Sequence, residues 1–170
     1  MCSSDLRPTA IRQETVRRPI QQAHLVLGTV APGYHDNRRH ALAVLNAVLG
    51  EGMSSRLFQR VRERHGYAYN IYSFLSMFND VSVFGVYAAV EPARIERAHA
   101  VILRELEALG RGGLPARELN RAKEQIIGTM VLGLESMSNR MSRLGRDELV
   151  FGRDVPRSEE HTSELQSRQS

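Results

Sequence analysis

The 170-residue sequence has a single cysteine, Cys2, no tryptophan and only one lysine. A lone cysteine excludes an internal disulfide and a zinc site built from cysteines. No apolar run approaches the ~20 residues that a membrane-spanning helix needs. Residues 1–22 contain no apolar stretch of the kind found in secretory signals. The sequence therefore predicts no membrane partner, and it favours a cytoplasmic over a periplasmic location.

The positive charge is carried by arginine, and the formal net charge is +4. Arginines gather between residues 56 and 64, as they do in some nucleic-acid-binding patches. Aromatic residues that could stack on bases are not interleaved with them, so we predict no nucleic-acid partner. A basic RNA-binding module is a minor alternative, which a steep loss of binding with salt would identify. The length and composition are otherwise those of one globular domain.

Both ends of the chain differ in character from the rest. Residues 157–170 (RSEEHTSELQSRQS) are polar, lack apolar periodicity and resemble the translation of adapter DNA used in short-read sequencing libraries. Residues 1–6 (MCSSDL) resemble read-through of the opposite adapter. We therefore expect residues 7–156 to be the natural domain, truncated at both ends, and exclude the outer segments from fold reasoning. A disordered natural tail is the alternative for the C-terminal segment.

The spacing of apolar residues predicts an α+β domain. Residues 23–31 form a nearly continuous apolar run of strand length, and helices are expected where apolar residues recur with a 3.6-residue period. In chain order we expect a strand (23–31), two helices (about 37–49 and 55–64), two strands (67–77 and 80–90) and two helices (about 91–109 and 114–144). That order predicts a mostly antiparallel sheet with helices packed on one face.

The last helical stretch carries apolar residues at helical spacing, which we expect to face the core. Its methionines are interpreted as core filling, because methionine adapts to irregular gaps. Gly128 and Gly133 are expected to bend the helix. The residues expected to point inward are Leu119, Ala122, Ile126, Met130, Leu134, Met137, Met141 and Leu144.

The stretch GEGMSSRLFQRVRERHGYAYNIY, residues 50–72, most resembles a chemical site. It predicts a glycine turn, a short basic helix with Arg62, and a strand with Tyr69 seven positions later. A guanidinium and a phenol that converge on one point are donors suited to a developing oxyanion. Taken alone, Arg62 fits a solvated arginine on a basic helix face better, and tyrosine is common in strands.

Four segments of the chain resemble the pitrilysin/insulinase-type zinc metallopeptidases, especially the bacterial members similar to the mitochondrial processing peptidase. The segments are IQQAHLVLG, GEGMSSRLFQRVRERHGYAYNIYSF, ELNRAKEQIIG and ESMSNRMSRLGRDELVFG, and the likeness runs from about Gln21 to Pro156. In that family a subunit has two similar α+β halves. The first half holds zinc through an inverted H-x-x-E-H motif, and the second half closes over the substrate.

This chain resembles the second half, because it contains no H-x-x-E-H motif. The resemblance implies that this chain binds no metal and that zinc belongs to the parent enzyme. The expected partners are a zinc-binding N-terminal domain or partner subunit and a peptide or protein substrate. The chain alone is expected to be inactive as a peptidase. A domain of an inactive scaffold or partner subunit of the same family is the alternative.

The resemblance also implies roles for individual residues. Arg62 and Tyr69 are expected to reach across to the scissile carbonyl and to stabilise its negative charge in the transition state. Gly50, Gly52 and Ser54 lie where some relatives carry a glycine-rich loop that contacts substrate. A tight turn between two helices is the simpler interpretation of those glycines.

Overall fold

A computed structural model describes residues 21–133 and 135–153 of the chain. Its sheet has three antiparallel strands: β1 (Ala23–Pro32), β2 (Ala68–Met77) and β3 (Val81–Val90). The strand order is β1-β3-β2, so the central strand β3 pairs with both neighbours. The segments expected from the sequence to be strands are therefore confirmed to within one residue at each end.

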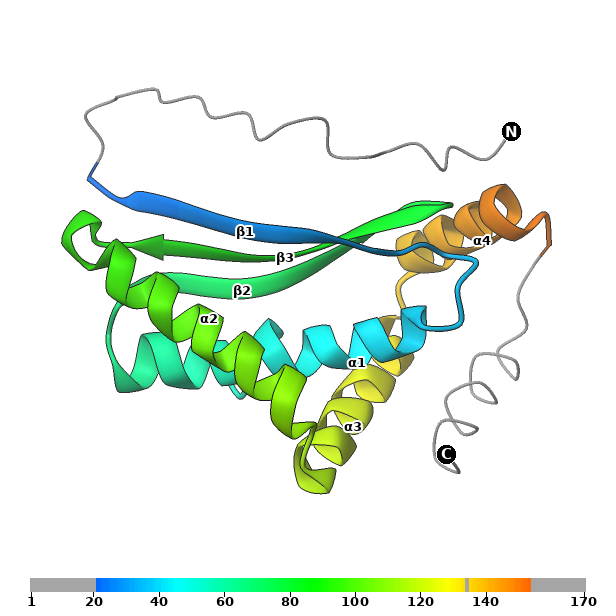
Figure 1. Ribbon diagram of the computed structural model, residues 1–170. Coiled ribbons are helices and arrows are strands. Elements are labelled where there is room, and N and C mark those ends of the chain that lie inside the picture. The colour runs from blue at the N-terminus through cyan, green and yellow to red at the C-terminus, as the bar shows by residue number, and fades with distance from the viewer. Residues whose placement is uncertain (1–20, 134, 154–170) are drawn as a thin grey trace.

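In the described part of the chain, six helical segments accompany the sheet. They are α1 (Arg39–Gly50), η1 (Phe58–Arg64), η2 (Pro92–Arg94), α2 (Ile95–Gly112), α3 (Ala116–Gly133) and α4 (Met137–Phe151). In Figure 1, α1, α2 and α3 lie on one side of the sheet, and α4 lies near one end of it. The predicted α+β class, with helices on one face of an antiparallel sheet, is confirmed.

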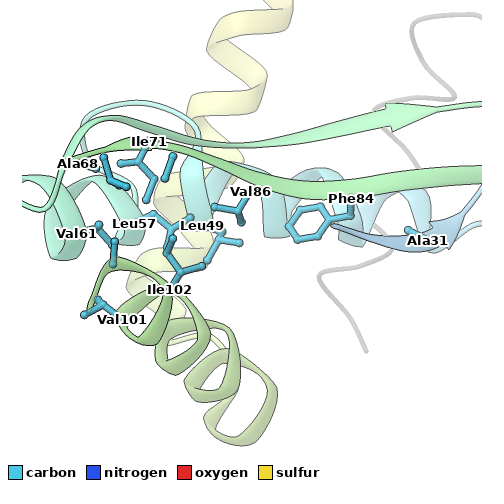
Figure 2. Packing of buried hydrophobic residues seen from close by; sticks show 13 residues of the cluster. Ala31, Leu49, Leu57, Val61, Ala68, Ile71, Phe84, Val86, Val101 and Ile102 are labelled. Atoms are coloured by element: carbon cyan, nitrogen blue, oxygen red, sulfur yellow. The ribbon is translucent and has the colours of Figure 1, made fainter. Parts of the chain in front are cut away.

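The core lies between the sheet and these helices. Alternate residues of a strand point to the same face, so Phe84, Val86, Ala88 and Val90 of β3 are buried towards the helices. Leu49, Leu57, Val61 and Ile102 from the helical side are completely buried against them. Figure 2 shows this cluster, with Leu57 and Val61 of the segment around η1 facing Ile71 and Ile102. The site-bearing segment, residues 50–72, which contains the predicted site, is thus anchored in the core.

A contact between α1 and β2 fixes the entry to the site-bearing segment. The Ser73 hydroxyl donates a hydrogen bond to the Asn46 side-chain oxygen at 2.7 Å. Gly50, the last residue of α1, is buried, and a Cβ built on it would lie 2.1 Å from the backbone nitrogen of Ser73. Only glycine permits this approach of helix to strand.

Two expectations for the C-terminal helices are wrong. The expected single stretch is two helices, because the chain leaves α3 at Gly133 and re-enters a helix after the Ser136 N-cap, whose hydroxyl accepts from the Asn139 N–H. Gly128, where a bend was expected, lies inside α3.

The second wrong expectation concerns the residues that are buried. Periodicity shows that a helix face is apolar but does not show what covers it. Four residues that were expected to lie in the core are exposed, namely Met130, Met137, Met141 and Leu144.

Other parts of the same expectation hold. Ala122 is buried and packs beside Ala47 and Val48 of α1, with Ile126 partly buried against them. Leu134 and the segments 1–6 and 157–170 lie outside the described residues. Within residues 21–133 and 135–153, none of the helices combines the length and apolar character that crossing a membrane requires.

Replacement of Gly50 by alanine should destabilise the domain. The new methyl group would collide with the Ser73 backbone, which cannot move without disturbing β2. We expect Gly50→Ala to lower the free energy of unfolding by about 1–3 kcal/mol, the usual effect of overpacking, measured by urea denaturation. Gly128→Ala is the matched control, because nothing lies within 4 Å of the position that its Cβ would occupy. It should be neutral or stabilising by about 0.5–1 kcal/mol, and equal midpoints for both variants would contradict the close approach.

Asp36, just before α1, should titrate well below its usual range. Its carboxylate accepts hydrogen bonds from the Arg38 side chain, at 2.7 and 3.1 Å, and from the Arg38 backbone N–H at 2.8 Å. These bonds lower the pKa of Asp36 from 3.8 to about 2. The pair therefore stabilises the fold above about pH 4, and this contribution is lost as the pH falls through about 2. In an NMR titration, Arg38→Ala should return the pKa towards 3.8, whereas a distant Arg64→Ala change should leave it low.

Candidate functional site

Arg62 lies on η1, a π-helical segment of seven residues. π-helical turns are rare and frequently occur at functional sites. The Arg62 side chain is exposed, and its guanidinium carbon lies 4.8 Å from the centre of the Phe58 ring, one turn earlier. A cation–π contact of this kind orients a guanidinium without neutralising its charge.

Two neighbouring arginines, Arg56 and Arg60, are engaged by other helices. Arg56 forms an ion pair with Glu118 of α3 at 2.7 Å, and Arg60 lies 3.6 Å from the buried Glu105 carboxylate of α2. Among the described residues, Arg62 has no such carboxylate partner within ion-pairing distance. It is therefore an η1 arginine whose charge is available to an outside group.

η1 ends in a left-handed turn at Gly66. Gly66 has a φ of +61°, a conformation that costs glycine little and other residues more. Its N–H donates to the Arg62 carbonyl at 2.9 Å, and the Tyr67 N–H donates to the Val61 carbonyl at 3.0 Å. The backbone of Arg62 is therefore part of the turn that leads the chain into β2.

Tyr69 occupies a bulge at the start of β2. Ala68 pairs with Val90 and Asn70 pairs with Ala89, so Tyr69 has no partner residue on β3. A bulge of this kind re-aims side chains and is common next to active sites. Tyr69 is 58% exposed between the buried residues Ala68 and Ile71. The phenol is thus accessible although the adjacent backbone is anchored in the core.

The two predicted donors lie on elements that are directly connected. Residues 65–67 alone separate η1 from β2, so Arg62 and Tyr69 flank one short turn, and both side chains are exposed. This arrangement leaves both groups open to a ligand that approaches from outside the domain. Their assignment as catalytic residues stays a prediction.

The three predicted substrate-contacting residues differ in accessibility. Gly50 is buried against β2 and packs the fold. Gly52 is exposed with a φ of +88°, and its carbonyl accepts a hydrogen bond from the Ser55 hydroxyl at 2.7 Å. Ser54 is partly exposed. Only Gly52 and Ser54 therefore lie where a peptide could reach them, and their contact with substrate stays a prediction.

The helix-free face of the sheet carries an aromatic cluster that sequence patterns do not reveal. Tyr72 and Tyr87 have ring centres 5.0 Å apart, and the Tyr87 hydroxyl is hydrogen-bonded to His24 Nδ1 at 2.7 Å. Alternation along the strands places each residue on this face, but their contact depends on the pairing of β1 and β2 with β3. From the sequence alone, Tyr72 is no more than an ordinary strand tyrosine.

The described residues contain no group of three or more histidine, cysteine, aspartate or glutamate side chains placed to hold a metal ion. A catalytic zinc site needs about three such protein ligands together with an open position for water. The side chains of this part of the chain therefore do not fit a resident catalytic zinc ion.

Comparison with known proteins shows which family the chain resembles. Residues 4–126 match the family described as "Peptidase M16 inactive domain". An uncharacterized zinc protease of Mycobacterium tuberculosis is 46% identical over 151 residues, which cover 89% of this chain and 34% of that protein.

Solved structures show the same fold. A peptidase M16 inactive domain from Pseudomonas fluorescens has a TM-score of 0.77 at 22% identity, covering 90% of this chain and 36% of that one. A chain of complex III2 from Candida albicans has a TM-score of 0.75 at 16% identity, covering 86% and 37%.

The chain spans about a third of the length of the curated relatives it matches. The family match extends over well more than half of the chain and includes the whole segment from α1 through η1 to β3. The chain therefore belongs to the family of peptidase M16 inactive domains, whose relatives carry the name zinc protease.

Proposed function

We propose that this domain is the second half of a zinc metalloendopeptidase, which closes over a peptide and supplies transition-state donors to a zinc site on a companion half. One observation carries the proposal: Arg62 and Tyr69 are exposed on either side of a single turn whose flanking elements are buried in the core. Groups held on anchored elements keep their position while remaining accessible to substrate.

The chemistry needs donors of this kind. When water attacks an amide, negative charge develops on the carbonyl oxygen. A tyrosine hydroxyl and a guanidinium can each donate hydrogen bonds to that oxygen. Each such donor stabilises the transition state by roughly 2–4 kcal/mol when water is excluded. Closure of the two halves would exclude that water. Arg62 and Tyr69 would then favour the tetrahedral intermediate over the planar amide.

The nucleophile has to come from outside this chain. The described residues do not form a zinc site, and the curated relatives named zinc proteases are about three times as long as the matched region. A zinc-binding half, on the same polypeptide or on a partner subunit, would supply the activated water. This domain contributes substrate enclosure and charge stabilisation.

An inactive scaffold or partner subunit is the second candidate. The observation in its favour is the shared fold of a chain in complex III2 from Candida albicans. That likeness, at 16% identity, concerns the fold alone. The exposed pair Arg62 and Tyr69 favours the enzymatic proposal, because neither side chain is needed for packing.

In the full-length protein, Arg62→Ala and Tyr69→Phe should each lower kcat about a hundredfold, as expected for loss of an oxyanion donor. Cleavage of an internally quenched fluorogenic peptide measures this effect. Because both side chains are exposed, the unfolding free energy should change by less than about 0.5 kcal/mol. Tyr67→Phe is the matched control, since Tyr67 belongs to the same turn but stacks on His65. Undiminished cleavage by both site variants would contradict the assigned roles.

Residues 7–156 expressed alone should not cleave peptides in a zinc-dependent manner, because the described residues hold no metal-binding group. Circular dichroism should first establish that the protein is folded. The same fluorogenic peptide is then incubated with the domain and zinc, with and without a chelator. Chelator-sensitive cleavage by the purified domain would contradict the assignment of the zinc site to a companion half.

A further inference from the structure

We propose that Arg94, held by Glu91, is a positioning residue that fixes the turn between Arg62 and Tyr69. The inference rests on the proposed function, since it assigns Arg94 a role in the same site. Arg94 lies at the end of η2, the single 3-10 turn that connects β3 to α2. The whole of β3 separates it from both donors in the sequence, so only the fold brings it to the turn.

One contact of Arg94 reaches the turn at Gly66, and two others hold Arg94 against Glu91. Its Nη1 donates a hydrogen bond to the Gly66 carbonyl at 2.9 Å. Its Nε lies 2.9 Å from the Glu91 carboxylate, which holds the guanidinium in place. The Arg94 backbone N–H also donates to the Glu91 carbonyl at 2.8 Å. The side chain and the backbone of Arg94 are therefore both tied to the 3-10 turn.

Gly66 is the residue through which this contact acts on both donors. Its N–H already donates to the Arg62 carbonyl at 2.9 Å, and its peptide group lies three residues before Tyr69. With its carbonyl bound to Arg94, Gly66 is held through both backbone groups. The Arg94 contact therefore fixes the orientation of the turn, and hence the angle between η1 and β2, relative to the start of α2.

The end of β3 lies beside the same turn. Val90, the residue before Glu91, pairs with Ala68, the residue before Tyr69. The β2 bulge and the 3-10 turn are therefore adjacent in space as well as connected through Gly66. A second contact, the ion pair between Arg60 and Glu105, joins η1 to the middle of α2. Of these two contacts, the hydrogen bond from Arg94 to Gly66 is the one that reaches the turn itself.

The contact is expected to matter more for geometry than for stability. Arg94 and Glu91 are both exposed, and ion pairs at such positions contribute little to folding free energy. Catalytic donors, by contrast, are sensitive to small displacements, and a shift of about 1 Å can cost up to 100-fold in rate. Arg94 should therefore affect turnover while leaving the unfolding transition almost unchanged.

The test is a double-mutant cycle in the full-length protein, using steady-state cleavage of the fluorogenic peptide. Arg94→Ala should lower kcat about tenfold and change KM by less than about twofold, because the substrate still binds while the donors are misplaced. In a Tyr69→Phe background, Arg94→Ala should lower kcat by a smaller factor than in the wild type, because one of the two donors whose position it fixes is already lost. Arg94→Lys, which keeps one donor for Gly66, should restore part of the rate.

Arg111→Ala is the matched control. Arg111 belongs to the same helix α2 and forms an exposed ion pair with Glu107 at 3.4 Å, but it is far along the helix from the turn. It should leave kcat unchanged. Equal effects of the two alanine variants, or an Arg94→Ala effect that multiplies fully with Tyr69→Phe, would overturn the positioning role while leaving the proposed function intact. If Arg62→Ala and Tyr69→Phe both leave the rate unchanged, the proposed function fails and the positioning role fails with it.

Discussion

The left-handed turn at Gly66 is the constraint on which the candidate site depends. A Cβ added at Gly66 would meet nothing within 4 Å, so the need for glycine comes from its φ of +61° and not from crowding. The turn reverses the chain from η1 into β2 and places Arg62 and Tyr69 on either side of residues 65–67.

Burial around this turn explains how exposed donors can be well placed. Leu57 and Val61 on one side of the turn and Ile71 on the other are almost completely buried in the same core (Figure 2). Side chains packed at this density leave little room for the backbone to shift. Arg62 and Tyr69 project outward from these anchored segments, so the free energy of packing also maintains the geometry of the site.

Sequence patterns predicted the order and type of nearly every element, because apolar spacing records which face of each element is buried. They could not predict the bulge at Tyr69, which exists only relative to β3, or the contact between Arg94 and Gly66, which joins residues far apart in sequence. Met137 and Met141 were placed wrongly for a similar reason: an apolar helix face does not specify the surface that covers it. The rest of the site therefore required tertiary information.

In the proposed mechanism, Arg62 and Tyr69 act together on one developing oxyanion. The most direct measurement is a crystal structure of the full-length protein bound to a phosphinic peptide, whose tetrahedral phosphorus mimics the intermediate of amide hydrolysis. We expect the Arg62 guanidinium and the Tyr69 hydroxyl both to lie about 3 Å from phosphinyl oxygen atoms. A complex in which the closed domain leaves both side chains pointing into solvent, with the phosphinyl group bound only by the companion half, would contradict it.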